Sequence, residues 1–138
     1  MAGRILGLDL GSVRIGAAVS DDEGRVAVPY GTIRAGAPED LKAIACLVRE
    51  QGIAEVVVGH PRSLSGERGE AATKAETFAG ALEQVLDVPV RLHDERLSTA
   101  EAERALRDAG VPARRRRRAV DASAATVILQ SFLDARPR

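Results

Sequence analysis

The sequence predicts an α/β protein with one mixed five-stranded sheet, its first three strands antiparallel, flanked by helices on both sides. Two observations support this fold class. Three strand-like segments follow one another with short connections, and the rest of the chain alternates helical and strand-like segments. The 138 residues, of which 45% are hydrophobic and 29% charged, fit a single globular domain over 1–138.

The first three strand-like segments form a predicted antiparallel meander. Arg4–Leu10 is apolar almost throughout, which is typical of a strand that is covered on both faces. Residues 11–14 connect it to Ile15–Ser20, and a turn at 21–24 leads to Arg25–Ile33. Such short connections join antiparallel neighbours, because a parallel crossover needs about a dozen residues or more.

The remaining chain is predicted to alternate helices and strands. A helix starts near Pro38, where proline and two following acidic residues suit the positive end of a helix, and it ends at Gly52. The further predicted elements are a strand at 54–58, a helix at 68–86, a strand at 88–93, a helix from a capping box at 98–101 to 110, and a last helix at 120–133. This order is that of the ribonuclease H-like fold, whereas many doubly wound folds begin with a parallel β-α-β unit.

The composition excludes several classes of protein. The single cysteine, Cys46, rules out a disulfide framework, and its apolar surroundings predict a buried core residue. Without a Cys/His cluster, a zinc site of standard spacing is excluded. We find no secretory signal and no apolar window near the roughly 20 residues of a membrane span, so we expect a cytoplasmic protein without a membrane partner.

One aspartate stands on the apolar side of the last predicted helix. Asp121 is in helical register with Ala125, Ile128 and Phe132, which form an apolar stripe. The opposite side of the helix carries Ser123, Thr126 and Gln130. A buried unpaired charge is costly, so this carboxylate needs backbone donors, an ion-pair partner or a metal. Helix capping or an ion pair with a preceding arginine is the structural alternative to a metal.

Two predicted strands also end at carboxylates. Asp9 closes an otherwise apolar strand, at a position where open α/β sheets bind ligands, although a turn-capping role fits equally well. The strand ending at His93 is followed by Asp94 and Glu95, and side-chain alternation does not choose between these two. His60 and His93 lie at or near strand ends, where structural roles are favoured over catalytic ones.

Three carboxylates at the ends of different elements can converge on one cleft that binds divalent cations. Carboxylate oxygens suit Mg²⁺ (or Mn²⁺), which keeps several waters and completes its shell with substrate phosphate. Two such ions can activate water and stabilise the leaving oxygen of a phosphodiester. The acidic pattern therefore indicates metal-dependent hydrolysis of phosphodiester bonds.

A run of arginines indicates an anionic partner, although the formal net charge is zero. The residues assigned to nucleic-acid binding are Arg14, Arg62, Arg114, Arg115, Arg116, Arg117 and Arg118. The last five are adjacent and precede a helix amino terminus, where the dipole disfavours cations. A phosphate backbone would offset this repulsion, and the few aromatic residues argue against base stacking. A solvated charge run is the alternative interpretation.

Four segments of the sequence resemble the motifs of the YqgF family, also called RuvX. The segments are 8–16 (LDLGSVRIG), 57–61 (VVGHP) with 65–66 (SG), 94–99 (DERLST) and 120–133 (VDASAATVILQSFL). They occur in the family's order across nearly the whole chain. One departure is His60, where the family usually has leucine.

The resemblance implies a ribonuclease H-like nuclease related to Holliday junction resolvases. Members of this family are assigned to maturation of the 5′ end of precursor small-subunit (16S) rRNA. By position, the resemblance implies that Asp9, Glu95 and Asp121 are the catalytic and metal-binding acids, which selects Glu95 over Asp94. The implied cofactor is Mg²⁺ or Mn²⁺. The implied partner is structured nucleic acid, with precursor rRNA as the substrate. We expect the protein to be a monomer or a homodimer.

Three other functions are compatible with parts of the sequence. A DNA junction resolvase must cut two strands symmetrically, so an obligate dimer would favour it. The segment 9–12 (DLGS) also resembles the first phosphate loop of actin and the sugar kinases, but those proteins bind nucleotide between two such domains. A non-catalytic RNA-binding factor for ribosome assembly would need the arginines and not the acids. A nuclease acting on structured RNA accounts for both.

Overall fold

The computed structural model describes residues 3–61, 69–94 and 124–136. Five strands form one sheet in the order β3-β2-β1-β4-β5. The strands are β1 (Arg4–Leu10), β2 (Arg14–Ser20), β3 (Ala27–Arg34), β4 (Ile53–His60) and β5 (Val90–Asp94). The helices are α1 (Glu39–Gln51), α2 (Glu70–Val85) and α5 (Ala124–Ala135). The helix predicted to end at residue 110 lies outside the described residues.

The sheet combines antiparallel and parallel pairs as the connection lengths predict. β1 pairs with β2 and β2 with β3 in antiparallel fashion, which forms the predicted meander. β4 pairs with β1 and β5 with β4 in parallel fashion. β4 extends beyond the predicted end at Val58, because Gly59 and His60 pair with His93 and Asp94 of β5.

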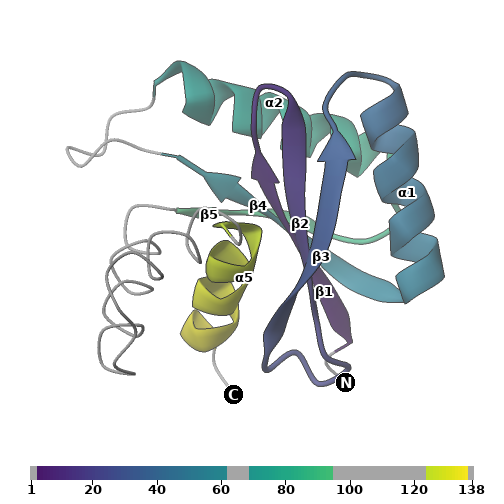
Figure 1. Cartoon of the computed structure of the whole chain (residues 1–138), viewed down its shortest axis with the longest axis vertical. Coiled ribbons are helices and arrows are strands. Elements are labelled where there is room, and N and C mark those ends of the chain that lie inside the picture. Colours follow the sequence, from purple (N-terminus) through teal and green to yellow (C-terminus); the bar gives the residue numbers. More distant parts are fainter. Residues whose placement is uncertain (1–2, 62–68, 95–123, 137–138) are drawn as a thin grey trace.

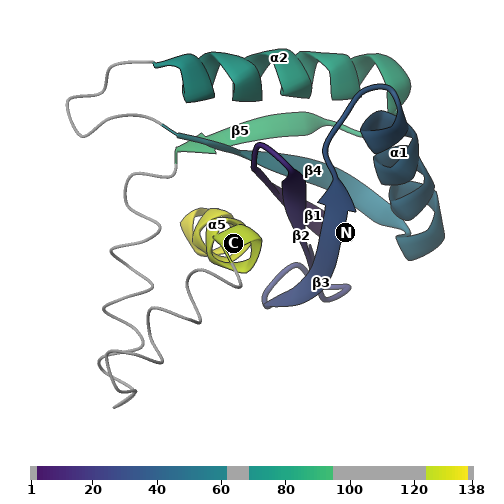
Figure 2. The ribbon, with the colours of Figure 1, turned by 45° about the horizontal axis from the view of Figure 1, so that its top comes forward.

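Helices cover both faces of the sheet, which confirms the predicted fold class. α1 and α2 lie on one face and α5 on the other (Figures 1 and 2). Side chains of a strand point alternately to the two faces. In β1, Leu6 and Leu8 join the hydrophobic cluster under α1 and α2, whereas Ile5 joins the cluster under α5. None of the three described helices is long and apolar enough to cross a membrane.

Nearby residues in the sequence explain where α1 begins and where it ends. In the first turn, the Asp40 carboxylate accepts hydrogen bonds from the backbone N–H groups of Gly36 at 3.0 Å and Leu41 at 2.7 Å. At the other end, Gly52 has a φ of 64°, in the left-handed region that favours glycine. Its N–H donates to the carbonyl of Arg49 and so closes the last turn.

Cys46 is exposed, so the prediction that it is a core residue is wrong. The buried side of α1 is formed by Ile44, Leu47 and Val48. Cys46 is two residues from both Ile44 and Val48, which places it on the other side of a helix with 3.6 residues per turn. Its thiol donates a hydrogen bond to Glu50 at 3.2 Å, and this carboxylate raises the pKa of Cys46.

α5 approaches the sheet closely at Gly7 of β1. A methyl group on Gly7 would lie 2.7 Å from Cβ of Leu129, which is closer than two carbon atoms can pack. The buried residues of α5 are Ala125, Ile128, Leu129 and Leu133. The structure therefore confirms an apolar stripe through Ala125 and Ile128, and it adds Leu129 because Gly7 makes room for that side chain.

The flank of α5 beyond this stripe packs on β3. The Oε1 atom of Gln130 accepts a hydrogen bond from the N–H of Ala27 at 2.9 Å, and its Nε2 donates to the carbonyl of Arg25 at 3.0 Å. Thr126, on the same flank, has a buried hydroxyl. The sequence places Thr126 and Gln130 opposite the apolar stripe. In the structure both side chains face the sheet, because the buried side of α5 is centred closer to Leu129 than the sequence predicts.

Candidate active site

The carboxyl ends of three strands meet at one edge of the sheet. Leu8 of β1 is in register with Val58 of β4, and His60 of β4 is in register with Asp94 of β5. Asp9 follows Leu8 directly and therefore lies at this edge, as the sequence predicts. Open α/β sheets bind their ligands at edges of this kind.

Asp9 shares a small cavity with the first turn of α5. It pairs with Gly16 of β2, and a methyl group on Gly16 would lie 3.8 Å from Cβ of Asp9 and 3.6 Å from Cβ of Ala125. The cavity has a volume of about 250 Å³. Its lining includes Asp9, Arg14, Gly16, Thr32, Ala125 and Thr126. Because Gly16 has no side chain, the space between the carboxylate and the helix stays open.

Two of the residues predicted for the site lie together in this cavity, namely Asp9 and Arg14. The others lie outside the described residues, and their places in the site stay predictions. They are Glu95, Asp121, Arg62, Arg114, Arg115, Arg116, Arg117 and Arg118. Two of them adjoin described parts of the site in the sequence. Glu95 follows the last residue of β5, and Asp121 stands three residues before Ala124, which lines the cavity.

Thr126 is a site residue that the sequence did not single out. Its Oγ1 atom is buried and has no hydrogen-bond partner among the described residues. An unsatisfied buried hydroxyl is unfavourable, and the residue that carries it lines the Asp9 cavity. No pattern in the sequence separates Thr126 from other threonines, because its position depends on how α5 is rotated on the sheet.

The donor atoms at this edge fit a hard divalent cation in part. Among the described residues, no group of three or more His, Cys, Asp or Glu side chains could hold a metal ion. Asp9 supplies one carboxylate at the cavity. Oxygen donors of this kind are those that Mg²⁺ and Mn²⁺ prefer, and Mg²⁺ is commonly held by only one or two carboxylates.

The two histidines near this edge contact the surrounding helices. The Nε2 atom of His60 lies 2.8 Å from Oε2 of Glu76 on α2. The Nε2 atom of His93 lies 2.9 Å from Oγ of Ser131 on α5, and its ring meets Phe132 edge to face at a centroid distance of 5.7 Å. These contacts tie β4 and β5 to helices on opposite faces, which fits the structural roles favoured for both histidines.

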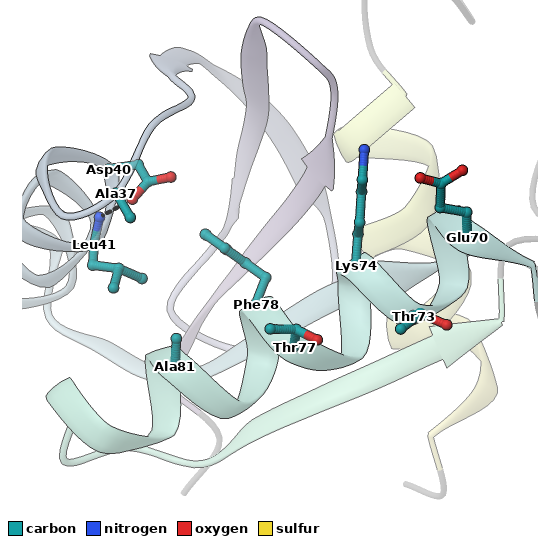
Figure 3. Close-up of a pocket in the computed structure, with 9 residues that line it drawn as sticks. All are labelled: Ala37, Asp40, Leu41, Glu70, Thr73, Lys74, Thr77, Phe78 and Ala81. Carbon is teal, nitrogen blue, oxygen red and sulfur yellow. Dashed lines mark hydrogen bonds between the residues drawn. The ribbon is translucent and has the colours of Figure 1, made fainter.

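A larger cavity, of about 530 Å³, lies on the opposite face between α1 and α2 (Figure 3). Figure 3 shows Phe78 of α2 pointing toward α1, where Leu41 also lines the cavity. Asp40 is at the same end, and its carboxylate already accepts two backbone hydrogen bonds. The size of this cavity does not make it the better candidate. Its lining surface is mainly apolar, although Glu70, Thr73, Lys74 and Thr77 also border it.

Comparison with solved structures defines the class of fold. RuvC of Thermus thermophilus, solved in complex with a Holliday junction substrate, superimposes with a TM-score of 0.55 at 17% identity. The match covers 96% of this chain and 94% of that chain. A second RuvC structure from the same organism gives a TM-score of 0.54 at 16% identity. The chain thus has a ribonuclease H-like fold.

Sequence comparison then defines the family. The family model described as RuvX, Holliday junction resolvase, matches residues 3–135. The chain belongs to this family, which confirms the resemblance seen in its motifs. A relative from Nocardia farcinica is 50% identical over 97% of this chain and 79% of the relative. A relative from Anaeromyxobacter dehalogenans is 52% identical over 96% of this chain and 98% of the relative. Both are named as candidate pre-16S rRNA nucleases.

Proposed function

We propose that the chain is a metal-dependent nuclease that processes the 5′ end of pre-16S rRNA in the cytoplasm. The observation that carries this proposal is the position of Asp9, which lines a cavity between the end of a central strand and the first turn of α5. The names of the two relatives described above support RNA as the substrate. Both relatives match nearly the whole of this chain, so the matched region includes the candidate site as well as the rest of the fold.

The proposed metal ligands are Asp9, Glu95 and Asp121. Asp9 is at the carboxyl end of β1, and Glu95 comes directly after β5, which ends at the same edge of the sheet. Asp121 precedes the helix whose first turn lines the Asp9 cavity. When bound, Mg²⁺ or Mn²⁺ would activate water and stabilise the leaving oxygen of the phosphodiester. The carboxylates would hold the ions, and Gly16 would leave room for them beside Asp9.

The proposed role of the arginine run at 114–118, with Arg62, is to bind the phosphate backbone without reading its sequence. Arginines that neutralise phosphates release condensed counterions, so binding weakens as salt rises. Replacing Arg115, Arg116 and Arg117 with alanine is expected to lower affinity for matched and scrambled RNA alike. The slope of log affinity against log salt should flatten by about two to three units, as measured by a salt titration. An unchanged slope would mean that the run is a solvated segment.

The decisive experiment offers two substrates to the purified full chain with Mg²⁺ or Mn²⁺. These are a precursor rRNA that carries the 5′ extension of 16S rRNA and a four-way DNA junction. We expect cleavage of the RNA at the mature 5′ end, with no cleavage by Asp9→Asn or in the presence of a chelator. Metal-independent cleavage, or equal cleavage by Asp9→Asn, would contradict the proposal.

The same experiment tests a second candidate function, cleavage of DNA junctions. The description of the family as Holliday junction resolvase supports it. Symmetric cleavage of the four-way junction in preference to the RNA would favour this function. A chain that binds RNA without cleaving it would instead favour a non-catalytic factor in ribosome assembly.

A further inference from the structure

Two arginines oppose each other across β2 and β3, beside the Asp9 cavity. Arg14 is in register with Arg34, and one step along the ladder is Ile15 with Ile33, followed by Gly16 with Thr32. Gly16 is in turn the partner of Asp9 in β1. Because side chains alternate along a strand, the two arginines share the face of the sheet that carries Asp9.

A β-bulge in β3 is what places Arg34 on this face. The register shifts between Ala17, which pairs with Gly31, and Ala18, which pairs with Pro29. Tyr30 is the extra residue between the two pairs. A shift of one residue turns every later side chain of a strand to the other face of the sheet. Without the bulge, Arg34 would point to the face covered by α1 and α2.

Arg14 and Arg34 have no ion-pair partner among the residues that the structure describes. Both side chains are exposed. In the part of the chain that the structure describes, other arginines form ion pairs, such as Arg4 with Asp22 at 2.9 Å, but Arg14 and Arg34 form none. Like charges that face each other across a strand pair destabilise the sheet. An anion bound between them would remove this repulsion.

The backbone around the two arginines is held by hydrogen bonds. The N–H of Gly11 donates to the carbonyl of Arg14 at 2.9 Å, and the N–H of Ala35 donates to the carbonyl of Val13 at 2.9 Å. A methyl group on Gly11 would lie 2.5 Å from that carbonyl oxygen of Arg14, so the turn requires glycine. The backbone that carries the two arginines is therefore fixed, so ligand binding has to order only their side chains.

We propose that Arg14 and Arg34 together clamp one phosphate of the substrate backbone, next to the phosphate that is cleaved. A guanidinium group matches a phosphate with two parallel hydrogen bonds, and two such groups can hold both free oxygens of one diester. Arg14 and Thr32 line the same cavity as Asp9, so the clamp adjoins the proposed reaction site. This inference rests on the proposed function, and it adds that the backbone crosses β2 and β3 beside the amino end of α5.

The test is a salt titration of RNA binding by the full chain in a chelating buffer, so that no cleavage occurs. The probes are the precursor rRNA segment and a scrambled RNA of equal length. Arg14→Gln and Arg34→Gln should each weaken binding about fivefold to tenfold at 0.1 M salt and lower the salt slope by about 0.7–0.9. Because one phosphate is shared, the double variant should lower the slope by little more than either single variant. Arg49→Gln on α1, an exposed arginine on the other face, should leave affinity and slope unchanged.

A second measurement separates a binding role from a structural one. Arg34→Gln should raise the melting temperature of the free protein, because it removes the repulsion from Arg14. An unchanged slope, slope losses that add fully in the double variant, a lowered melting temperature or a wild-type protein that binds neither RNA would each overturn the clamp. Wild-type binding without cleavage after Mg²⁺ is added would overturn the proposed nuclease and leave the clamp supported.

Discussion

The two faces of the sheet differ in how completely helices and apolar side chains cover them. Under α1 and α2, side chains of β1, β2 and β4 join the larger hydrophobic cluster. Under α5, a smaller cluster ends at Ala125, and beyond it the sheet carries Asp9, Arg14 and Thr32 around a cavity. The polar groups therefore lie where the cover of a single helix, α5, ends. One face supplies stability, and the incompletely covered face supplies the candidate site.

Two neighbouring residues of β1 show this division. Leu8 is completely buried in the larger cluster, and Asp9 lines the cavity on the other face. The two residues are adjacent in the central strand β1, but their side chains point to opposite faces of the sheet. Substitutions at the two positions should therefore separate stability from activity.

The largest expected effect follows from Asp9→Asn. The substitution keeps the size of the side chain and removes its charge, so metal binding should weaken. A metal ion contributes several kcal/mol to the transition state, and the cleavage rate should fall about a thousandfold or about 4 kcal/mol. Single-turnover cleavage of precursor rRNA measures the rate, and circular dichroism measures the melting temperature. A large loss of stability with little loss of rate would show that Asp9 is mainly structural.

Leu8→Ala should have the opposite profile. Removing a fully buried leucine leaves a cavity in the larger cluster, so the free energy of unfolding should fall by about 3 kcal/mol. Urea denaturation measures this change, and cleavage by the folded fraction should stay near that of the wild type. The matched control is Leu92→Ala on β5, where the side chain is 41% exposed and the loss should be below about 1 kcal/mol. Equal losses in the two variants would contradict the position of Leu8 in the buried core.

Gly7→Ala tests how closely α5 packs. The added methyl group meets Cβ of Leu129, so α5 must shift or the strand must bend, at a cost of about 2 kcal/mol. Gly80→Ala on α2 makes the same chemical change where no atom lies within 4 Å of the new group. That variant should gain up to about 1 kcal/mol, because alanine favours a helix over glycine. Urea denaturation measures the free energy of unfolding of both variants. If both substitutions changed it in the same direction, the close approach of α5 would be contradicted.

The smallest expected effect is at the turn between β2 and β3, away from both faces. Backbone N–H groups of Val26 and Arg25 donate to the Asp21 carboxylate and hold its pKa below the ordinary value of 3.8. A carboxyl group with a lowered pKa in the folded state stabilises the protein above its unfolded-state pKa, and this contribution is lost as the pH falls through the folded-state value. Between about pH 5 and pH 3, wild-type melting temperature should therefore fall slightly more than that of Asp21→Asn. Parallel thermal melts of the two proteins check this, and identical acid profiles would exclude the contribution.

Much of the fold and one part of the site follow from local features of the sequence. Loop lengths predicted the meander, and a charged residue at the end of an apolar strand predicted that Asp9 lies at an edge of the sheet. The prediction that Cys46 is buried was wrong, because a run of apolar residues does not reveal which side of a helix faces the core. Glu95 and Asp121, which the family resemblance assigns to the site, stay predictions.

The sequence by itself determined the order of the elements that the structure describes and the candidate acid Asp9. Periodicity, loop length and a charge at the end of an apolar strand can be recognised without knowing what packs against them. Only the tertiary structure decided which residues share a face. Arg34 joins Arg14 because one bulged residue, Tyr30, changes the register of β3. Thr126 reaches the cavity because α5 is rotated toward the space above Gly7. Both outcomes depend on contacts between segments far apart in the chain, and no local pattern encodes such contacts.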